Sequence, residues 1–308
     1  MLRALPHSPR VASRVGRSGA PSLGLVRIDL HTHSGASDGT EPAEEVVAQA
    51  ARAGLDVVAL TDHDTYAGWP AAVAAATEQG VAVVRGIEIS CSRKGISIHL
   101  LGYLPDPEHH GLDREIARAR RSRVTRIERM VQKMAAAGIP VTIEDVRAQA
   151  GEDTTMGRPH IADALVANGV VRDRAEAFAD ILRNGSRFYV SHYAPDPVRA
   201  VELVRAAGGV PVMAHPFAKA RGWTVGGDVI EEMARAGLAG LEAAHRDHSA
   251  GERARAEELA ARLGLFTTGS SDYHGAGKEN RLGEHTTEPE VLARIEEQAT
   301  SGVEVVRP

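Results

Sequence analysis

Short apolar runs and amphipathic stretches alternate along most of the chain. Runs of about four to eight apolar residues bounded by turn-forming residues predict buried strands, whereas apolar positions three or four residues apart predict helices. The predicted strands are Val26–Leu30, Asp56–Thr61, Ala82–Ile89, Ile96–Gly102, Val210–His215, Gly240–Ala243 and Phe266–Ser270. The helices predicted between them include Glu41–Ala53, Ala67–Gln79, Pro197–Ala207, Val229–Ala236 and Ala250–Leu263.

This alternation of strand and helix favours parallel strands with helices packed outside them. A glycine follows each of these helices, as is common at helix C-termini: Gly54, Gly80, Gly208, Gly237 and Gly264. Seven strands are enough to close a barrel. We therefore predict an α/β fold, either a barrel or a doubly wound sheet.

One segment, residues 105–189, interrupts the alternation because it contains helical patterns but no convincing strand. Its predicted helices are Leu112–Ala137, Ile143–Ala150, Pro159–Asn168 and Arg174–Arg183. We interpret this segment as a helical insertion into a core formed by residues 25–104 and 190–308. The insertion is either a stabilising appendage or a lid that contributes contacts to substrate.

Charge is distributed unevenly along the chain. Residues 1–24 mix Arg, Ser, Pro and Gly without apolar periodicity, which predicts a disordered basic tail, with a transit peptide as the alternative. Residues 1–27 hold five of the 36 basic residues and none of the 41 acidic ones. The remainder therefore has a net charge near −10 and would repel a phosphate ester unless local cations intervene.

The composition also excludes several classes of protein. No run of about 18 apolar residues is present, which argues against a membrane-spanning helix. Cys91 is the only cysteine, so no internal disulfide can form, and we expect a cytoplasmic location. Aromatic residues make up 4% of the chain, too few for a long track that binds single-stranded nucleic acid.

Imidazole and carboxylate side chains gather in and after the predicted strands. His31 and His33 are two positions apart in an extended chain, so they face the same side, and Asp272 and His274 repeat this spacing. A lone buried Glu88 needs a cation or a strong partner. The full candidate set of metal ligands is His31, His33, Asp38, His63, Glu88, His99, His215, Asp272 and His274.

These nine groups exceed what one ion needs. Two or three divalent ions that share Glu88 as a bridge would use all of them, and the mixed imidazole and carboxylate donors suit Mn, Fe or Zn. Asp64 or Asp62 is a candidate to hold the second nitrogen of His63. The chain has no GxSxG elbow and no GxxxxGK[ST] loop, so we expect a metal-bound hydroxide, rather than a protein side chain, to act as the nucleophile.

The insertion contributes weaker candidates. Arg158 and His160 lie at the start of a predicted helix, where arginine and free N–H groups favour phosphate binding, and His192 could bind phosphate or metal. The alternatives are a surface charge for Arg158 and a helix-face residue for His160. His245 and His248 follow a predicted strand, and their sequence context assigns them no role.

These motifs carry a family resemblance. In the order of the chain they are His31-Thr32-His33-Ser34, Thr61-Asp62-His63-Asp64, Gly86-Ile87-Glu88, Ala214-His215-Pro216 and Ser271-Asp272-Tyr273-His274. The series resembles the signature of the PHP (polymerase and histidinol phosphatase) superfamily of metallophosphoesterases. The insertion, with GRPHIA at 157–162 and YVSH at 189–192, is similar to that of bacterial nucleoside 3′,5′-bisphosphate phosphatases and 5′–3′ exoribonucleases.

The resemblance implies a distorted (β/α)7 TIM-like barrel with a trinuclear site of Mn, Fe or Zn. Transferred motif by motif, one ion would be held by His31, His33, Glu88 and Asp272. A second would be held by Glu88, His99 and His215, and a third by Asp38, His63 and His274.

The expected activity is hydrolysis of nucleotide phosphomonoesters, first of all the 3′-phosphate of nucleoside 3′,5′-bisphosphates. A 5′–3′ exoribonuclease on short RNA and a 5′-nucleotidase or histidinol phosphatase are alternatives within the same chemistry. A non-catalytic metal-binding PHP module is the alternative from another class. The expected partner is a small phosphorylated substrate, with no membrane and no obligatory protein partner.

Overall fold

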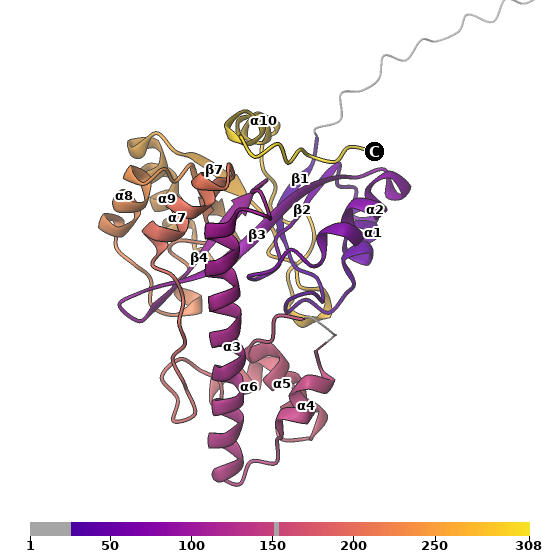
Figure 1. The fold of residues 1–308 in the computed structure, drawn as a ribbon, viewed down its shortest axis with the longest axis vertical. Coiled ribbons are helices and arrows are strands. Elements are labelled where there is room, and N and C mark those ends of the chain that lie inside the picture. Colours follow the sequence, from indigo (N-terminus) through magenta and orange to yellow (C-terminus); the bar gives the residue numbers. More distant parts are fainter. Residues whose placement is uncertain (1–25, 151–153) are drawn as a thin grey trace, which may run out of the picture.

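The computed structural model describes residues 26–150 and 154–308, so the predicted tail at residues 1–24 lies outside the described residues. Seven strands form one sheet in chain order (Figure 1): β1 Ile28–Thr32, β2 Val57–Leu60, β3 Ala82–Arg93, β4 Ile96–Tyr103, β5 Val210–Met213, β6 Gly240–Ala244 and β7 Phe266–Gly269. The sheet curls into a nearly closed barrel, because Thr32 bridges Tyr273 beyond β7. The backbone N–H of Ser271 also donates to the Asp29 carboxylate, at 3.0 Å.

All seven predicted strands are confirmed, but their predicted parallel arrangement is wrong for β4. This strand is antiparallel to both β3 and β5, and the other neighbours are parallel. The physical reason is the connection from β3 to β4, which consists only of Lys94 and Gly95. Both residues have positive φ, as a tight hairpin turn requires, and a parallel crossover needs a much longer connection.

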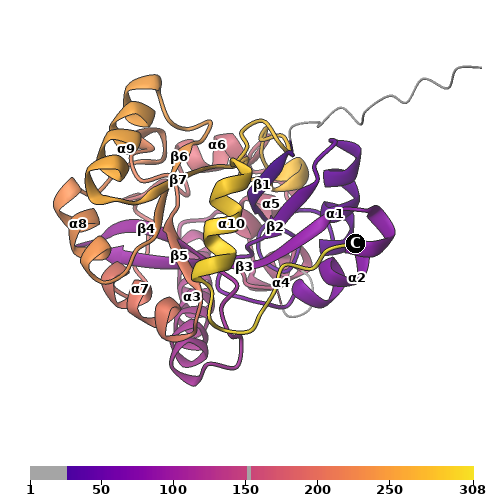
Figure 2. The same ribbon diagram turned by 90° about the horizontal axis from the view of Figure 1, so that it is seen from above.

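Six helices pack outside the barrel: α1 Ala43–Arg52, α2 Trp69–Gln79, α7 Pro197–Ala206, α8 Gly227–Arg235, α9 Ala250–Leu263 and α10 Pro289–Gln298. All except α10 lie at or close to the predicted positions. Figure 2 shows α10 across the end of the barrel at which β1 begins. Side chains such as Leu203, Met233 and Leu259 bury the inner faces of these helices against the strands, which stabilises the barrel by removing apolar surface from water.

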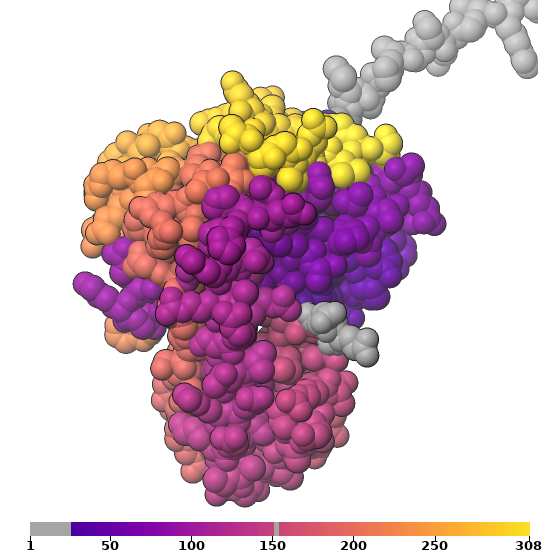
Figure 3. Space-filling model, viewed as in Figure 1, coloured from indigo at the N-terminus to yellow at the C-terminus, as the bar shows by residue number. Residues whose placement is uncertain are grey.

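In its described residues, 105–150 and 154–189, the interrupting segment contains four helices and no strand: α3 His110–Ala136, α4 Ile143–Ala148, α5 Arg158–Ala167 and α6 Arg174–Ala179. They form a lobe at the opposite end of the barrel from α10 (Figures 1 and 3). The first turns of α3 pack on the barrel through Leu112 and Ile116, whereas Ile127 and Met130 further along belong to a separate apolar cluster within the lobe. No helix in the described ranges is long and apolar enough to cross a membrane.

Candidate metal centre

The nine predicted ligands all lie at the end of the barrel that faces the lobe. His31 and His33 come from β1 and the residue after it, Glu88 from β3 and His99 from the antiparallel β4. His99 is half-buried, and the other eight side chains are buried. His215 and Asp272 have positive φ, a backbone strain that is typical of functional sites.

The first group consists of His31, His33, Glu88 and Asp272, whose ligand atoms converge on one point. The two Nε2 atoms of the histidines are 3.0 Å apart, and they lie 3.2 and 3.1 Å from Glu88 Oε2. Asp272 Oδ1 lies 3.4 and 3.3 Å from the same nitrogens. Ligands about 2.1 Å from one ion are separated by roughly 3.0–3.4 Å in octahedral or tetrahedral geometry. The spacing therefore fits one divalent ion.

The second group brings Asp38, His63 and His274 together with His33. His274 Nε2 lies 3.2 Å from Asp38 Oδ1, and His63 Nε2 lies 3.8 Å from Asp38 Oδ2. His274 donates its Nδ1 hydrogen to the carbonyl of Asp272 at 2.8 Å, which leaves a lone pair on Nε2. That buried Nε2 makes no hydrogen bond in the structure, as expected of a nitrogen aimed at a metal.

Glu88 joins the groups because its carboxylate contacts imidazoles from four strand ends. Oε2 lies 3.2 Å from His63 Nδ1, while Oε1 lies 2.8 Å from His99 Nδ1 and 3.4 Å from His215 Nε2. Burial raises the pKa of Glu88, but His63, His31 and His99 outweigh it and hold the pKa well below its usual value. The third convergent group is His63, Glu88 and His99, with His215 beside it rather than within it.

Sequence reasoning missed Glu242, a fully buried residue of β6 that orients the first group. Its Oε1 accepts a hydrogen bond from His31 Nδ1 at 2.9 Å, so the lone pair of His31 Nε2 faces the centre. Its Oε2 accepts the backbone N–H of His215 at 3.0 Å. Burial raises the pKa of Glu242, but His31 outweighs this effect and lowers the pKa to about 2. A lone glutamate in an apolar strand was the available signal, as it was for Glu88.

We predict that Glu242→Gln lowers metal affinity and phosphoesterase activity by roughly 10- to 100-fold, the usual effect of losing a residue that orients a metal ligand. The amide removes the charge that favours a metal-binding tautomer of His31. Metal titration followed by activity assays measures the effect. Glu258→Gln on the exposed side of α9 is the matched control and should leave both properties unchanged. Wild-type metal affinity in the Glu242 variant would contradict the orienting role.

Similarity to known proteins identifies the family of this chain. The model of the PHP domain family matches residues 29–112. The chain is 33% identical over 270 residues to a 3′,5′-nucleoside bisphosphate phosphatase of Chromobacterium violaceum, covering 88% of this chain and 95% of that protein. The chain belongs to the PHP family. The nine predicted ligands of this PHP protein therefore lie in a family that includes a named phosphatase.

Other relatives have different named substrates. A phosphoribosyl 1,2-cyclic phosphate 1,2-diphosphodiesterase of Eggerthella lenta is 32% identical, with 80% of this chain and 94% of that protein covered. A 5′–3′ exoribonuclease of Haemophilus influenzae is 36% identical, with 62% and 69% covered. A solved structure from Bifidobacterium adolescentis, described as a candidate metal-dependent phosphoesterase, is 39% identical with a TM-score of 0.86, covering 89% and 96%. This PHP protein is a metal-dependent phosphoesterase.

The donor atoms of the PHP centre fit divalent ions. Mixed imidazole and carboxylate ligands are typical of transition metals, and two buried nitrogens, His63 Nδ1 and His274 Nε2, lack any hydrogen-bond partner in the described structure. Divalent ions bound here would supply Lewis acidity, which activates water and neutralises phosphoryl oxygens. The protein's part is to hold the ligands in position.

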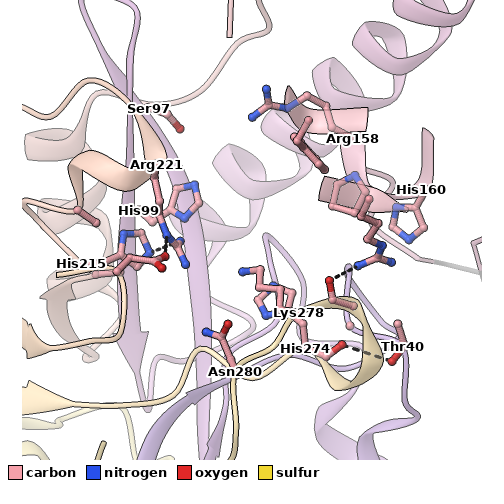
Figure 4. Close-up of a pocket in the computed structure, with 18 of the residues that line it drawn as sticks. Thr40, Ser97, His99, Arg158, His160, His215, Arg221, His274, Lys278 and Asn280 are labelled. Atoms are coloured by element: carbon pink, nitrogen blue, oxygen red, sulfur yellow. Dashed lines mark hydrogen bonds and ion pairs between the residues drawn. The ribbon is translucent and has the colours of Figure 1, made fainter. Parts of the chain in front are cut away.

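Two cations next to the PHP centre were not predicted. Arg221 contacts the Asp272 carboxylate with one nitrogen and approaches His215 Nε2 to 3.0 Å with another, as Figure 4 shows for the histidine. Lys278 Nζ lies 3.0 Å from Asp272 Oδ2. These two groups place positive charge beside the metal ligands, where phosphoryl oxygens would bind.

The remaining histidines near β6 differ in what they contact. His245 is buried; its Nδ1 accepts the Asp247 N–H at 3.0 Å, and its Nε2 lies 3.6 Å from Asp272 Oδ2. His248 instead bonds backbone groups, with Nδ1 2.8 Å from the Ala243 carbonyl and Nε2 accepting the Phe217 N–H. His245 therefore borders the centre, and His248 ties two loops together.

Asp64 does not contact His63. Its Oδ1 accepts the Ser90 N–H at 2.9 Å, and its Oδ2 pairs with Arg123 of α3 at 3.1 Å. Asp62 is bonded to Ser34 and Ser37 instead. These contacts show that Asp64 connects the PHP barrel to the lobe and that Asp62 holds the loop after β1.

Two of the three predicted substrate residues, Arg158 and His160, lie across a large cavity from the metal centre, and His192 does not line this cavity. The cavity has a volume of about 2730 Å³, and Figure 4 shows Arg158 and His160 on α5 opposite His215 and Arg221. His160 Nδ1 accepts the Gly157 N–H at 3.0 Å, so its Nε2 carries the hydrogen when the ring is neutral. Burial and then Arg126, Arg123 and Arg158 lower the pKa of His192 to about 3. His192 is therefore neutral at physiological pH.

Proposed function

We propose that this protein hydrolyses the 3′-phosphate of nucleoside 3′,5′-bisphosphates. The observation that carries the proposal is a pair of arginines in the lobe that faces the metal centre: Arg126, which is buried, and Arg158, which is half-buried and lines the cavity. A substrate with two phosphates would place one at the metal ligands and the other near these arginines.

The surroundings of the two arginines leave their charge uncompensated. Arg126 donates to the Val190 carbonyl at 2.8 Å and lies over the Tyr189 ring. Arg158 donates to the Leu182 carbonyl and to Asn184 Oδ1, both at 2.8 Å. Among the described residues, no carboxylate pairs with either guanidinium within 4.0 Å. Burial and Arg158 lower the pKa of Arg126 to about 9. A bound phosphate would offset the cost of desolvating these charges.

The named activity of the Chromobacterium violaceum relative supports the same substrate class. In this reading Arg221 and Lys278 bind oxygens of the phosphate that is removed, and His160 and His192 border the second phosphate. We further propose two or three ions of Mn, Fe or Zn at the centre and a cytoplasmic location. The absence of an obligatory protein partner stays a prediction.

Inorganic phosphate release by the Mn-loaded protein tests the proposal. The panel holds adenosine 3′,5′-bisphosphate, AMP, histidinol phosphate, phosphoribosyl 1,2-cyclic phosphate and a 5′-phosphorylated RNA trimer. Preference for the bisphosphate, with AMP as product, is the expected result. Stepwise release of mononucleotides from the trimer would move the assignment to an exoribonuclease. Tight metal binding without turnover of any ester would favour a non-catalytic module.

We predict that Arg158→Ala selectively weakens use of the bisphosphate. Because a hydrogen bond to a charged group contributes about 1.5–3 kcal/mol, kcat/KM for adenosine 3′,5′-bisphosphate should fall roughly 10- to 100-fold. Adenosine 3′-phosphate lacks the second phosphate, so its kcat/KM should change less than about threefold. Arg147→Ala, on the exposed surface of α4, is the matched control. Equal losses on both substrates would show that Arg158 does not contact the second phosphate.

A further inference from the structure

Trp223 is a large apolar side chain left in water. Its exposed fraction is 86%, whereas the other tryptophan, Trp69, is 6% exposed. In the described part of the chain, the only other large exposed apolar residue is Val26, at the far end of β1. Trp223 is therefore isolated rather than part of a contiguous apolar patch of the kind that binds another protein.

This tryptophan lines the same cavity as Arg158 and as His99, His215 and His274 of the metal centre. It follows the short helix η1 (Lys219–Arg221), and Arg221 contacts Asp272 and His215 of the centre. Two peptide units put the Cα atoms of Arg221 and Trp223 within about 7.6 Å of each other. Gly222, which joins Arg221 to Trp223, lies close to the lobe, because a Cβ built on it would be 3.6 Å from Asn184 Nδ2. Asn184 in turn accepts from Arg158.

The backbone at Gly222 accounts for the position of the indole. Gly222 has φ 123° and ψ −148°, a conformation that is essentially restricted to glycine. This glycine conformation follows Arg221 directly. The contacts of Arg221 with Asp272, His215 and Asp247 hold the residue before Gly222 in place. An exposed indole is thereby placed at the cavity between the two cationic regions, without packing against the protein core.

We propose that Trp223 stacks on the nucleobase of the substrate. This inference rests on the proposed function and adds to it the residue that recognises the base. A nucleotide with phosphate groups near Arg221 and Arg158 has its base within reach of the intervening rim. Every base offers an aromatic face, so stacking contributes affinity with little base preference. The other aromatic side chains that line the cavity, Phe178 and Tyr189, already have the guanidinium groups of Arg158 and Arg126 over their rings.

Intrinsic fluorescence tests the stacking directly. The Mn-loaded protein is titrated with AMP, the product that keeps both the base and the 5′-phosphate, and in parallel with ribose 5-phosphate, which lacks the base. AMP should quench the emission of Trp223, and ribose 5-phosphate should not. In W223F only the buried Trp69 emits, so the quenching should disappear. Quenching that persists in W223F, or none in the wild type at concentrations at which AMP inhibits, would overturn the proposal.

Kinetics provides the second readout. W223A should raise KM for adenosine 3′,5′-bisphosphate roughly 5- to 150-fold, the range for loss of one base–aromatic stack, with kcat within about threefold. W223F keeps an aromatic face and should restore most of the affinity. Hydrolysis of β-glycerophosphate, which has no base, should not change. Equal losses on β-glycerophosphate would mean that Trp223 only positions the Arg221 loop. No loss on either substrate would show that Trp223 does not stack on the base.

The two levels of the argument fail separately. If AMP quenches Trp223 but the bisphosphate is not hydrolysed, the stacking residue stands and the proposed substrate is wrong. If the bisphosphate is hydrolysed and W223A behaves as wild type, the substrate assignment stands and the stacking proposal is wrong.

Discussion

Replacing Glu88 by glutamine is expected to reduce phosphoesterase activity by about a thousandfold or more, because this one carboxylate contacts five imidazoles of the centre. Its two oxygens lie within 3.4 Å of nitrogens of His31, His33, His63, His99 and His215. The amide of glutamine presents one oxygen and one N–H₂ group, so it would hold divalent ions less well and would not neutralise their charge. Metal ions contribute several kcal/mol to such reactions, and about 1.4 kcal/mol corresponds to tenfold.

The measurement is kcat/KM for phosphate release together with the metal content per chain after dialysis. Both should fall in Glu88→Gln, and the circular dichroism spectrum should stay that of the wild type, because glutamine has nearly the same volume. Glu78→Gln, an exposed change at the end of α2, is the matched control and should retain activity and metal. A Glu88 variant with full metal content and at least a tenth of wild-type activity would show that Glu88 is not the shared ligand.

The second large effect concerns metal removal and pH. We expect the thermal stabilisation that Mn²⁺ gives to the metal-free protein to grow by several degrees as the pH rises from 6.5 towards 9. In the metal-free protein, burial lowers the pKa of His33, but hydrogen bonds to Asp272 and Glu88 outweigh this and raise the pKa to about 9. The pKa of His31 is also raised well above its ordinary value, against the effect of burial, by Glu88, Glu242 and Asp272.

The direction of the effect comes from proton linkage. A raised histidine pKa stabilises the metal-free fold fully below the unfolded value near 6.5, and this contribution is lost as the pH rises through about 9. For His33 the loss amounts to about 3 kcal/mol. A metal ion needs the neutral imidazole, so protons compete with it, and metal affinity rises up to about tenfold per pH unit for each proton displaced.

Unfolding temperatures with and without Mn²⁺, measured over this pH range, test the prediction. His33→Asn removes one of the two titrating ligands and should reduce the dependence on pH, with His31 accounting for the remainder. His110→Asn, an exposed change at the start of α3, should leave it intact. A stabilisation by Mn²⁺ that does not change between pH 6.5 and 9 would show that the histidines of the metal-free centre carry no displaceable protons.

The strands were predictable because their apolar runs are short, buried and bounded by turns. The direction of β4 was not, because the hairpin before it is concealed. Ser90, Ser92 and Arg93 are polar, so the apolar pattern of β3 ends at Ile89, yet the strand continues to Arg93 through its ladder with β4. Pairing with a neighbouring strand satisfies the backbone there regardless of side-chain polarity. The predicted gap thus concealed a two-residue turn.

In the candidate site, too, some residues could be predicted from local sequence patterns and others could not. Ligands such as His31, His33 and Asp272 were visible because spacing along one extended strand is a local property. Arg221 reaches Asp272 across 51 positions and lies in a loop whose path depends on Gly222. Contacts of this kind depend on tertiary packing, and no periodicity in the sequence predicts them. Glu242 lies between these cases, since a buried lone carboxylate was a readable signal.

The continuity of α3 has a consequence for how the cavity is sized. The uninterrupted helix α3 packs against the barrel core at Leu112 and against the core of the lobe at Met130. Arg126 lies on the helix between these two contacts. The length of this helix sets the distance between the barrel and the lobe, because each helical residue adds about 1.5 Å. Lengthening it by four residues would move the lobe outward by about 6 Å. The length of α3 therefore determines the distance from the barrel to the arginines of the lobe. It also determines how long a substrate can be and still span the cavity.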